Sequence, residues 1–130
     1  MTKEDPLSEL LVDAVEADRR SIATALKGRV ALDSSSGRLV LSPGYNDLDS
    51  RRKVLVVLLG RKAAFLLNLT DSEALTNKDV TDVSGLPPGT AAPGLKSLRE
   101  MRLVSQDPSK AYYVPNAQIL SAVGFLTGAK

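Results

Sequence analysis

The chain has 130 residues, of which 43% are hydrophobic, and this is long enough for one compact domain with its own core. It contains no cysteine and no histidine, which excludes thiolate chemistry, disulfide bonds and the usual zinc ligand sets, and removes the commonest general base. The net charge is only +2, but residues 1–50 hold six Lys/Arg against nine Asp/Glu, whereas residues 51–130 hold eleven against six. The second part of the chain is therefore the part suited to a polyanion, although a difference of this size also arises by chance on soluble surfaces.

The first long segment, Pro6 to Lys27, is predicted to form an amphipathic helix. Its apolar residues recur at spacings of four and seven, and Gly28 follows as a terminator. A first helix of this kind either forms a dimerisation or docking arm or covers its own domain. The residues before it are charged and contain no apolar signal core, so we expect a cytoplasmic protein.

A β-hairpin is predicted next. Two short alternating runs, Arg29–Asp33 and Arg38–Ser42, flank the turn Ser34–Gly37. Gly37 can supply the positive φ that such a turn requires. We expect a structural hairpin rather than a basic ribbon, because Asp33 dilutes the two arginines.

Residues 50–69 are predicted to form the central core helix, after a loop over residues 43–48. Asp47 or Asp49 can cap this helix, because an Asx side chain accepts the unpaired amide hydrogens of a first turn. The apolar run is interrupted by Gly60-Arg61-Lys62 and falls short of the roughly 18 to 20 residues that a membrane span needs. No association with a membrane is expected.

The segment that follows has the pattern of a short helix. Thr76 is predicted to cap it, with Asp79 in the place of the usual Glu of a capping box. Val80 and Val83 are expected to turn inward. Gly85 is expected to end the helix in the left-handed conformation that glycine adopts without strain.

A second helix is predicted from Thr90 to Arg102. Thr90 is expected to cap it, and Pro93 is expected to lie in the first turn, where its missing amide hydrogen breaks no bond. On a helical wheel Ala91, Leu95, Leu98 and Arg102 share one side, and Ala91, Leu95 and Leu98 are expected to face the core. The outward side consists of Pro93, Lys96, Ser97 and Glu100, flanked by Thr90, Ala92 and Arg99.

The rest of the chain is predicted to form a strand pair and a last helix. A strand begins at Leu103-Val104, and a polar tip and a tyrosine-containing return strand follow it. Asn116 is the expected cap of a helix that runs to Leu126 with an apolar stripe of Ile119, Leu120, Val123 and Leu126. This helix is expected to pack on the first one, within one chain or across a dimer.

Residues 76–105, followed by Ala-Tyr-Tyr-Val-Pro at 111–115, resemble the winged helix-turn-helix of small prokaryotic transcription regulators such as the MarR-like and ArsR-like groups. The match covers residues 54–114, and its most specific parts are Gly89-Thr90, Leu95 to Leu98 and Leu103-Val104. The resemblance implies that the second helix enters a DNA major groove and that residues 107–110 form the wing. No effector-binding or metal-binding signature of those groups is matched.

The expected fold class is α+β: a mainly helical winged helix-turn-helix with an N-terminal helix, a β-hairpin and a C-terminal helix. We expect residues 1–49 to be a dimerisation or docking extension and residues 50–130 to be the winged helix domain. The expected function is binding of double-stranded DNA by a homodimeric transcription regulator without a cofactor or metal. The alternative is a winged helix that contacts another protein and not DNA. An enzyme is not expected, because the serines at 34–36 have no base beside them in sequence and no phosphate-binding loop of Walker type occurs.

The residues expected to contact DNA combine the outward face of the second helix, the wing and a basic cluster on the central helix. They are Thr90, Ala92, Pro93, Lys96, Ser97, Arg99, Glu100 and Lys110, with Arg51, Arg52 and Lys53. Thr90 and the helix N-terminus can donate to a phosphate, and Lys96 and Arg99 can reach phosphates or base edges. Glu100 is repelled by phosphate unless it accepts from a cytosine amine.

Overall fold

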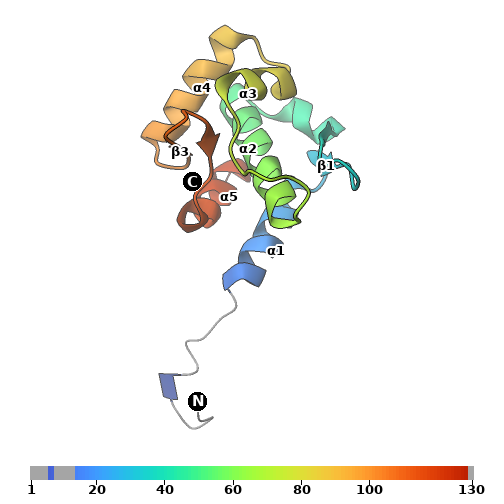
Figure 1. Cartoon of the computed structure of the whole chain (residues 1–130), viewed down its shortest axis with the longest axis vertical. Helices are drawn as coiled ribbons and strands as arrows, with labels where there is room; N and C mark the ends of the chain where they lie inside the picture. The colour runs from blue at the N-terminus through green and yellow to red at the C-terminus, as the bar shows by residue number, and fades with distance from the viewer. Residues whose placement is uncertain (1–5, 8–13, 129–130) are drawn as a thin grey trace.

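The computed structural model describes residues 6–7 and 14–128. Over these residues the fold is α+β and mainly helical, as the sequence predicts, with five α-helices and two small antiparallel sheets of two strands each. Figure 1 shows the arrangement. The elements are α1 (Ala14–Leu26), β1 (Val30–Leu32), β2 (Leu39–Leu41), the 3-10 helix η2 (Pro43–Asp47), α2 (Ser50–Leu66), α3 (Asn77–Ser84), α4 (Pro88–Glu100), β3 (Ser105–Gln106), β4 (Tyr112–Tyr113), the 3-10 helix η3 (Asn116–Gln118) and α5 (Ile119–Leu126).

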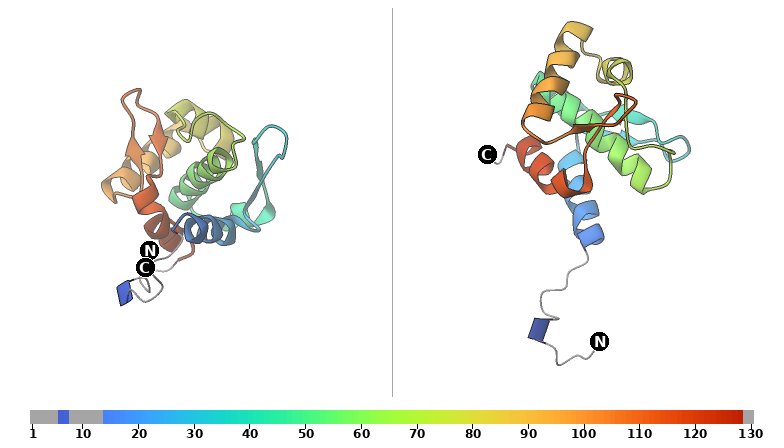
Figure 2. Two further views of the ribbon diagram at one scale, coloured as in Figure 1. Left: turned by 60° about the horizontal axis from the view of Figure 1, so that its bottom comes forward. Right: turned by 60° about the vertical axis from the view of Figure 1, so that its left-hand side comes forward.

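Helix α2 is the centre of the core. Asp49 caps it, and its carboxylate accepts from the Arg52 N–H at 2.9 Å. Every side chain from Val54 to Leu59 is at most 1% exposed. The helices α1, α3, α4 and α5 all contact it, and the two hairpins lie on opposite sides of it in Figure 1 and in the left view of Figure 2. Within the described residues no helix has the length and apolar character needed to cross a bilayer.

The central helix ends at Leu66 and not at Leu69 as predicted. Asn68 takes the left-handed conformation with φ +62°, which reverses the chain direction. The Leu69 N–H then donates to the Ala64 carbonyl at 2.9 Å, which gives this carbonyl of the last turn a hydrogen-bond partner.

The first predicted helix is present as α1 from Ala14, and Gly28 with φ +84° follows it as expected. The part of the prediction at residues 8–13 lies outside the described residues. Ile22 and Leu26 are buried, as the apolar stripe requires. Helix α1 packs on both α2 and α5, which confirms that the last helix packs on the first one within one chain.

Two glycines allow the first hairpin to pack closely against α2 and the segment that follows it. The strands pair with Val30 opposite Leu41, and Gly37 has φ +73° in the turn, as predicted. A Cβ on Gly37 would lie 2.8 Å from the Cβ of Leu69, and a Cβ on Gly60 would lie 2.3 Å from Cδ1 of Leu39. Gly37 therefore lets the hairpin turn approach the segment that follows α2, and Gly60 lets β2 approach α2 itself.

Helix α3 begins and ends as predicted. The Thr76 hydroxyl accepts from the Asp79 N–H at 3.1 Å, and the Asp79 carboxylate accepts from the Thr76 N–H at 3.2 Å. This reciprocal pair is a capping box. Gly85 follows the helix with φ +75°, and Val80 is fully buried while Val83 is half-buried.

Helix α4 starts earlier than predicted, at Pro88 rather than Thr90. Pro87 is extended and Pro88 takes the first helical position, where its fixed φ favours a helix start, so Thr90 lies within the first turn and is not the cap. Pro93 consequently lies inside the helix, beyond the first turn in which it was expected. The buried face is the predicted one, because Ala91, Leu95 and Leu98 have no exposed surface.

The predicted end of this helix is also wrong. Helix α4 stops at Glu100 and not at Arg102, which has φ +64° and is exposed. The wheel assumed that helical phase continued to Arg102. Instead, the chain turns so that Leu103 and Val104 enter the core.

The prediction for the last helix needs two corrections. Asn116 does not cap it but begins the 3-10 helix η3, and Gln118 precedes α5 without a side-chain cap. The buried face consists of Ile119, Ala122 and Leu126. Leu120 is 62% exposed, because it follows Ile119 and points about 100° away from that face.

A single hydrophobic cluster joins the segment expected as an extension to the segment expected as the main domain. Ile22, Val30 and Tyr45 belong to the same cluster as the buried residues of α2, α4 and α5. The described part of residues 1–49 therefore shares its core with the rest of the chain.

Tyr45 ties the region before α2 to the end of α3. Its side chain is 3% exposed, and its hydroxyl donates to the Ser84 carbonyl at 2.6 Å. Burial raises the pKa of Tyr45 to about 12, so this hydroxyl keeps its proton well above neutral pH. The hydrogen bond satisfies a carbonyl of the last turn of α3, where intrahelical donors are missing.

We predict that Tyr45→Phe lowers the free energy of unfolding by about 1 to 2 kcal/mol, because it leaves the buried Ser84 carbonyl without its donor. Urea unfolding followed by circular dichroism measures the change. Tyr113→Phe is the matched control, since Tyr113 is half-buried and its hydroxyl makes no hydrogen bond within residues 6–7 and 14–128. Equal effects of the two substitutions would contradict the assignment.

Candidate nucleic-acid interface

Helices α3 and α4 and the turn between them form one outer layer over α2. Gly85 ends α3, the turn continues to Pro87, and α4 then crosses α2. A Cβ on Gly94 would lie 3.3 Å from Cγ2 of Val54, so this glycine lets the two helices approach closely. The buried face of α4 rests on the core, and its opposite face is open to solvent.

The β3–β4 hairpin lies beside α4, as Figure 2 shows. Its strands pair with Ser105 opposite Tyr113 and Gln106 opposite Tyr112. Leu75, just before α3, extends this sheet, because its N–H and carbonyl exchange hydrogen bonds with Tyr112 at 2.9 and 2.7 Å. The start of α3 and the hairpin are therefore held together by main-chain bonds.

The hairpin loop, residues 107–110, is ordered by one carboxylate. Oδ1 of Asp107 accepts from the Ser109 N–H, the Ser109 hydroxyl and the Ala111 N–H, each at 2.9 Å. The Ala111 N–H is the main reason that the pKa of Asp107 lies below its ordinary value. The half-buried Asp107 carboxylate therefore has all three of these hydrogen-bond partners within its own loop.

Lys110 closes the same loop in a conformation that is unfavourable for its residue type. Its φ is +69°, a position that hairpins of this kind usually give to glycine. Its N–H donates to the Asp107 carbonyl at 2.8 Å, and its side chain is exposed. Lys110, the cation of the loop, therefore has a strained backbone conformation.

A side-chain bridge joins α4 to the hairpin. The Arg99 guanidinium donates to the side-chain carbonyl of Gln106, and Nε2 of Gln106 donates to the Lys110 carbonyl at 3.1 Å. Arg99 and Gln106 also line an open cavity of about 540 Å³ together with Arg102. The bridge holds the end of α4 and the hairpin loop at one edge of the molecule.

The structure brings together most of the residues expected from the second helix and the loop. Pro93, Lys96, Arg99 and Glu100 are exposed on α4, and Lys110 is exposed in the loop. Thr90, Ala92 and Ser97 are only partly exposed. We call the exposed cations Lys96, Arg99, Arg102 and Lys110 the basic edge.

The three cations at the start of α2 already have partners within the chain. The Arg52 guanidinium donates to the Phe125 carbonyl at 2.9 Å and to Asp49 at 2.7 Å, and lies 4.3 Å from the centroid of the Phe125 ring. Lys53 lies 5.4 Å from the ring centroid of Tyr45. Arg51 is exposed, with Nη1 3.6 Å from the sulfur of Met101. These contacts hold α2 against α5, η2 and the end of α4.

Sequence reasoning missed Arg102 and Gln106. The helical wheel placed Arg102 within the helix, on the side shared with Leu95 and Leu98, whereas its backbone is left-handed and lies just after α4. The apolar pair Leu103-Val104 was the available signal, because two adjacent residues that must both be buried do not fit the continuing phase of α4. Gln106 gave no signal, because its role depends on the pairing of β3 with β4.

Comparisons with protein-family models, with curated proteins and with solved structures found no match to this chain. The described residues contain no cluster of three or more acidic, histidine or cysteine side chains that could hold a metal ion.

We predict that Asp107→Ala loosens the hairpin loop, whereas Asp107→Asn, which keeps an acceptor oxygen, loosens it less. Amide hydrogen exchange at Ser109 and Ala111 should be several-fold faster in the alanine variant than in the native protein. In the native protein the protection by the carboxylate is complete above its ordinary pKa of 3.8 and is lost as the pH falls through the lowered pKa. Unchanged exchange in Asp107→Ala would show that the main-chain bonds alone hold the loop.

Proposed function

We propose that residues 50–128 form a winged helix-turn-helix and that the protein binds double-stranded DNA, as a homodimeric transcription regulator. Helix α4 is the recognition helix in this proposal, and the β3–β4 hairpin is the wing. The observation that carries the proposal is the bridge from Arg99 through Gln106 to the Lys110 carbonyl, which holds the cations of α4 and of the hairpin at one edge. A helix and a hairpin that present cations side by side match the major groove and the adjacent phosphates.

The charges at this edge support phosphate contact more than base readout. Four exposed cations make up the basic edge, whereas Asp107 is engaged within its loop. Glu100 is the remaining exposed acid on α4, and it can accept from a cytosine amine in the major groove. Affinity should therefore come mostly from phosphates and fall steeply as salt is added.

The backbone of the basic edge gives a second reason for a functional role. Three non-glycine residues in the described chain have positive φ, and two of them are Arg102 and Lys110. This conformation costs a residue with a Cβ about 1 to 2 kcal/mol, and such strain often marks functional positions. Cations kept at strained positions beside α4 are consistent with selection for charge at this edge.

A protein-binding role is the second candidate, and a different surface favours it. An apolar cavity of about 530 Å³ lies between α1, β1 and the end of α2. Leu67 at its margin is 54% exposed. In this alternative Leu67→Asp abolishes a stoichiometric complex that survives nuclease treatment, whereas Lys96→Glu leaves it intact.

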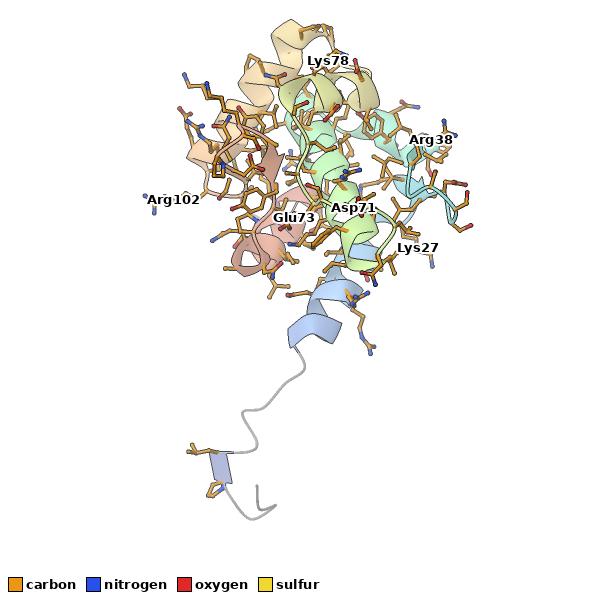
Figure 3. All side chains as sticks on the ribbon, viewed as in Figure 1. Lys27, Arg38, Asp71, Glu73, Lys78 and Arg102 are labelled. Carbon is orange, nitrogen blue, oxygen red and sulfur yellow. The ribbon has the colours of Figure 1, made fainter. Side chains whose placement is uncertain are left out.

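For DNA binding, we predict that Lys96→Glu weakens affinity for duplex DNA about tenfold at ~100 mM salt and reduces the salt dependence by about one phosphate contact. Fluorescence anisotropy with a labelled mixed-sequence duplex measures both quantities. Lys27→Glu is the matched control, because Lys27 is also exposed and lies on the other side of the molecule from Arg102 in Figure 3. No binding at low salt, or equal losses in both variants, would refute the proposal.

We also predict that the residue at position 110 affects the free energy of unfolding and the DNA affinity in opposite directions. Lys110→Gly should raise the free energy of unfolding by about 0.5 to 1 kcal/mol, because glycine relieves the positive φ, and should weaken DNA binding. Asn68→Gly is the control, since Asn68 also has positive φ but follows α2, away from the basic edge. Its DNA affinity should equal that of the native protein. If the Lys110→Gly variant binds DNA as tightly as the native protein does, Lys110 does not contact DNA.

A further inference from the structure

A lysine is buried in the core helix. Lys62, in the second half of α2, is 2% exposed, and its ammonium group forms an ion pair with the carboxylate of Glu73. Glu73 lies in the connection between α2 and α3, and its side chain is 30% exposed. The side-chain bridge of the basic edge involves neither residue. The role of this ion pair is therefore separate from that bridge.

The stability of the core does not by itself explain a charge at position 62. Taking two charges out of water is costly, and replacing a buried ion pair by apolar residues of similar size is often neutral or stabilising. Leu58 and Leu59, one turn earlier on α2, are fully buried, so an apolar side chain at position 62 would continue the same face. An apolar contact, however, has no direction, whereas an ammonium group determines where its carboxylate partner lies.

The connection that carries Glu73 has little else with which to bind α2. Figure 1 shows it running back beside α2 toward α3. Residues 70–74 contain no large apolar side chain, and the hydroxyls of Thr70 and Ser72 bond to the main chain of the same segment, each at 3.0 Å. Within the described chain, the pair of Lys62 and Glu73 is the one polar side-chain contact that joins this segment to another element.

Glu73 directly precedes the place where α3 and the second hairpin meet. Leu75 exchanges main-chain hydrogen bonds with Tyr112 of β4, and Thr76 caps α3. Two elements of the outer layer are therefore joined within three residues of Glu73. The ion pair connects this place to the core helix, and it does so through a side chain that is itself buried.

We propose that Lys62 is a positioning residue, which determines through Glu73 where the pairing of Leu75 with Tyr112 lies relative to α2. Because the same hairpin carries Lys110, the place of this exposed cation then depends on a charge in the core. Lys62 contacts no DNA in this role. The consequence for DNA affinity rests on the proposed function, whereas the positioning of the hairpin does not.

The test uses the full chain and removes the ion pair from each end in turn. Lys62→Met should leave the urea midpoint equal or higher, because methionine is unbranched like lysine and has no charge to bury. Glu73→Met should lower the midpoint, because it leaves the Lys62 ammonium group buried and unpaired. Both variants should nevertheless speed amide exchange at Leu75 and Tyr112 at least about fivefold relative to the amide of Leu58 in α2.

Asp71→Asn is the matched control. Asp71 is the other acid of the connection, it is labelled beside Glu73 in Figure 3, and its side chain is exposed. The substitution removes one negative charge from the same segment without touching the ion pair, so the midpoint and the exchange at Leu75 and Tyr112 should stay as in the native protein.

A role in stability alone would give a different pattern. Exchange at Leu75 and Tyr112 would then follow the midpoint, so that it is unchanged or slower in Lys62→Met and faster in Glu73→Met. That pattern would overturn the proposal. If Glu73→Met does not fold, the exchange in Lys62→Met decides alone, because this variant is expected to keep the native midpoint.

The anisotropy titration with duplex DNA measures the consequence for binding. Lys62→Met should weaken affinity about threefold, because the hairpin cation is held less precisely. Combined with Lys110→Gly it should add no further loss, because both changes act on the same cation. Full affinity in Lys62→Met despite faster exchange at Tyr112 would overturn the link to DNA and leave the positioning role supported. If the native protein binds no DNA, the exchange measurement still decides the positioning role.

Discussion

The complete burial of α2 is the constraint on which the other elements depend. Its side chains from Val54 to Leu59 are all excluded from solvent, and a helix that is apolar on every side is stable in water only when neighbours cover every side. Two glycines allow those neighbours to pack closely. Gly60 of α2 leaves room for the Leu39 side chain of the first hairpin, and Gly94 of α4 leaves room for the Val54 side chain of α2. The first hairpin and α4, with its outward face, are therefore both held against the same buried helix.

The sequence predicted best those features that a few neighbouring residues decide. The capping box of Thr76 and Asp79, the left-handed Gly85 and the turn at Gly37 each need only local chain geometry, and all three are present. The inward face of α4 was also predictable, because a spacing of three and four residues determines which side chains share a side. For the same reason Pro93, Lys96 and Glu100 were correctly expected to face outward.

The errors concern features that depend on contacts between distant parts of the chain. The partner of Arg52 is another such feature, because its guanidinium binds the Phe125 carbonyl, 73 residues away, and no local pattern shows this contact. Leu120 was expected in the apolar stripe, but the face that α5 presents to α1 and α2 excludes it. Arg102 was misplaced because the end of α4 is set by the burial of Leu103 and Val104. The candidate surface was thus predictable as a helix face with a hairpin loop, but the side-chain bridge through Gln106 that joins the two was not.

Helix α4 has a composition that opposes helix formation, and this has a consequence for the order of folding. Gly94 costs about 1 kcal/mol relative to alanine, and the internal Pro93 costs about 3 kcal/mol, so a free peptide of this sequence would remain a coil. The helix is stable only because Ala91, Leu95 and Leu98 are buried against elements that must already be in place. We therefore expect α4 to form late, after α2 and the well-capped α3 have assembled. A synthetic fragment of residues 88–100 cannot take the place of the intact domain, because the shape of the helix is supplied by the core beneath it.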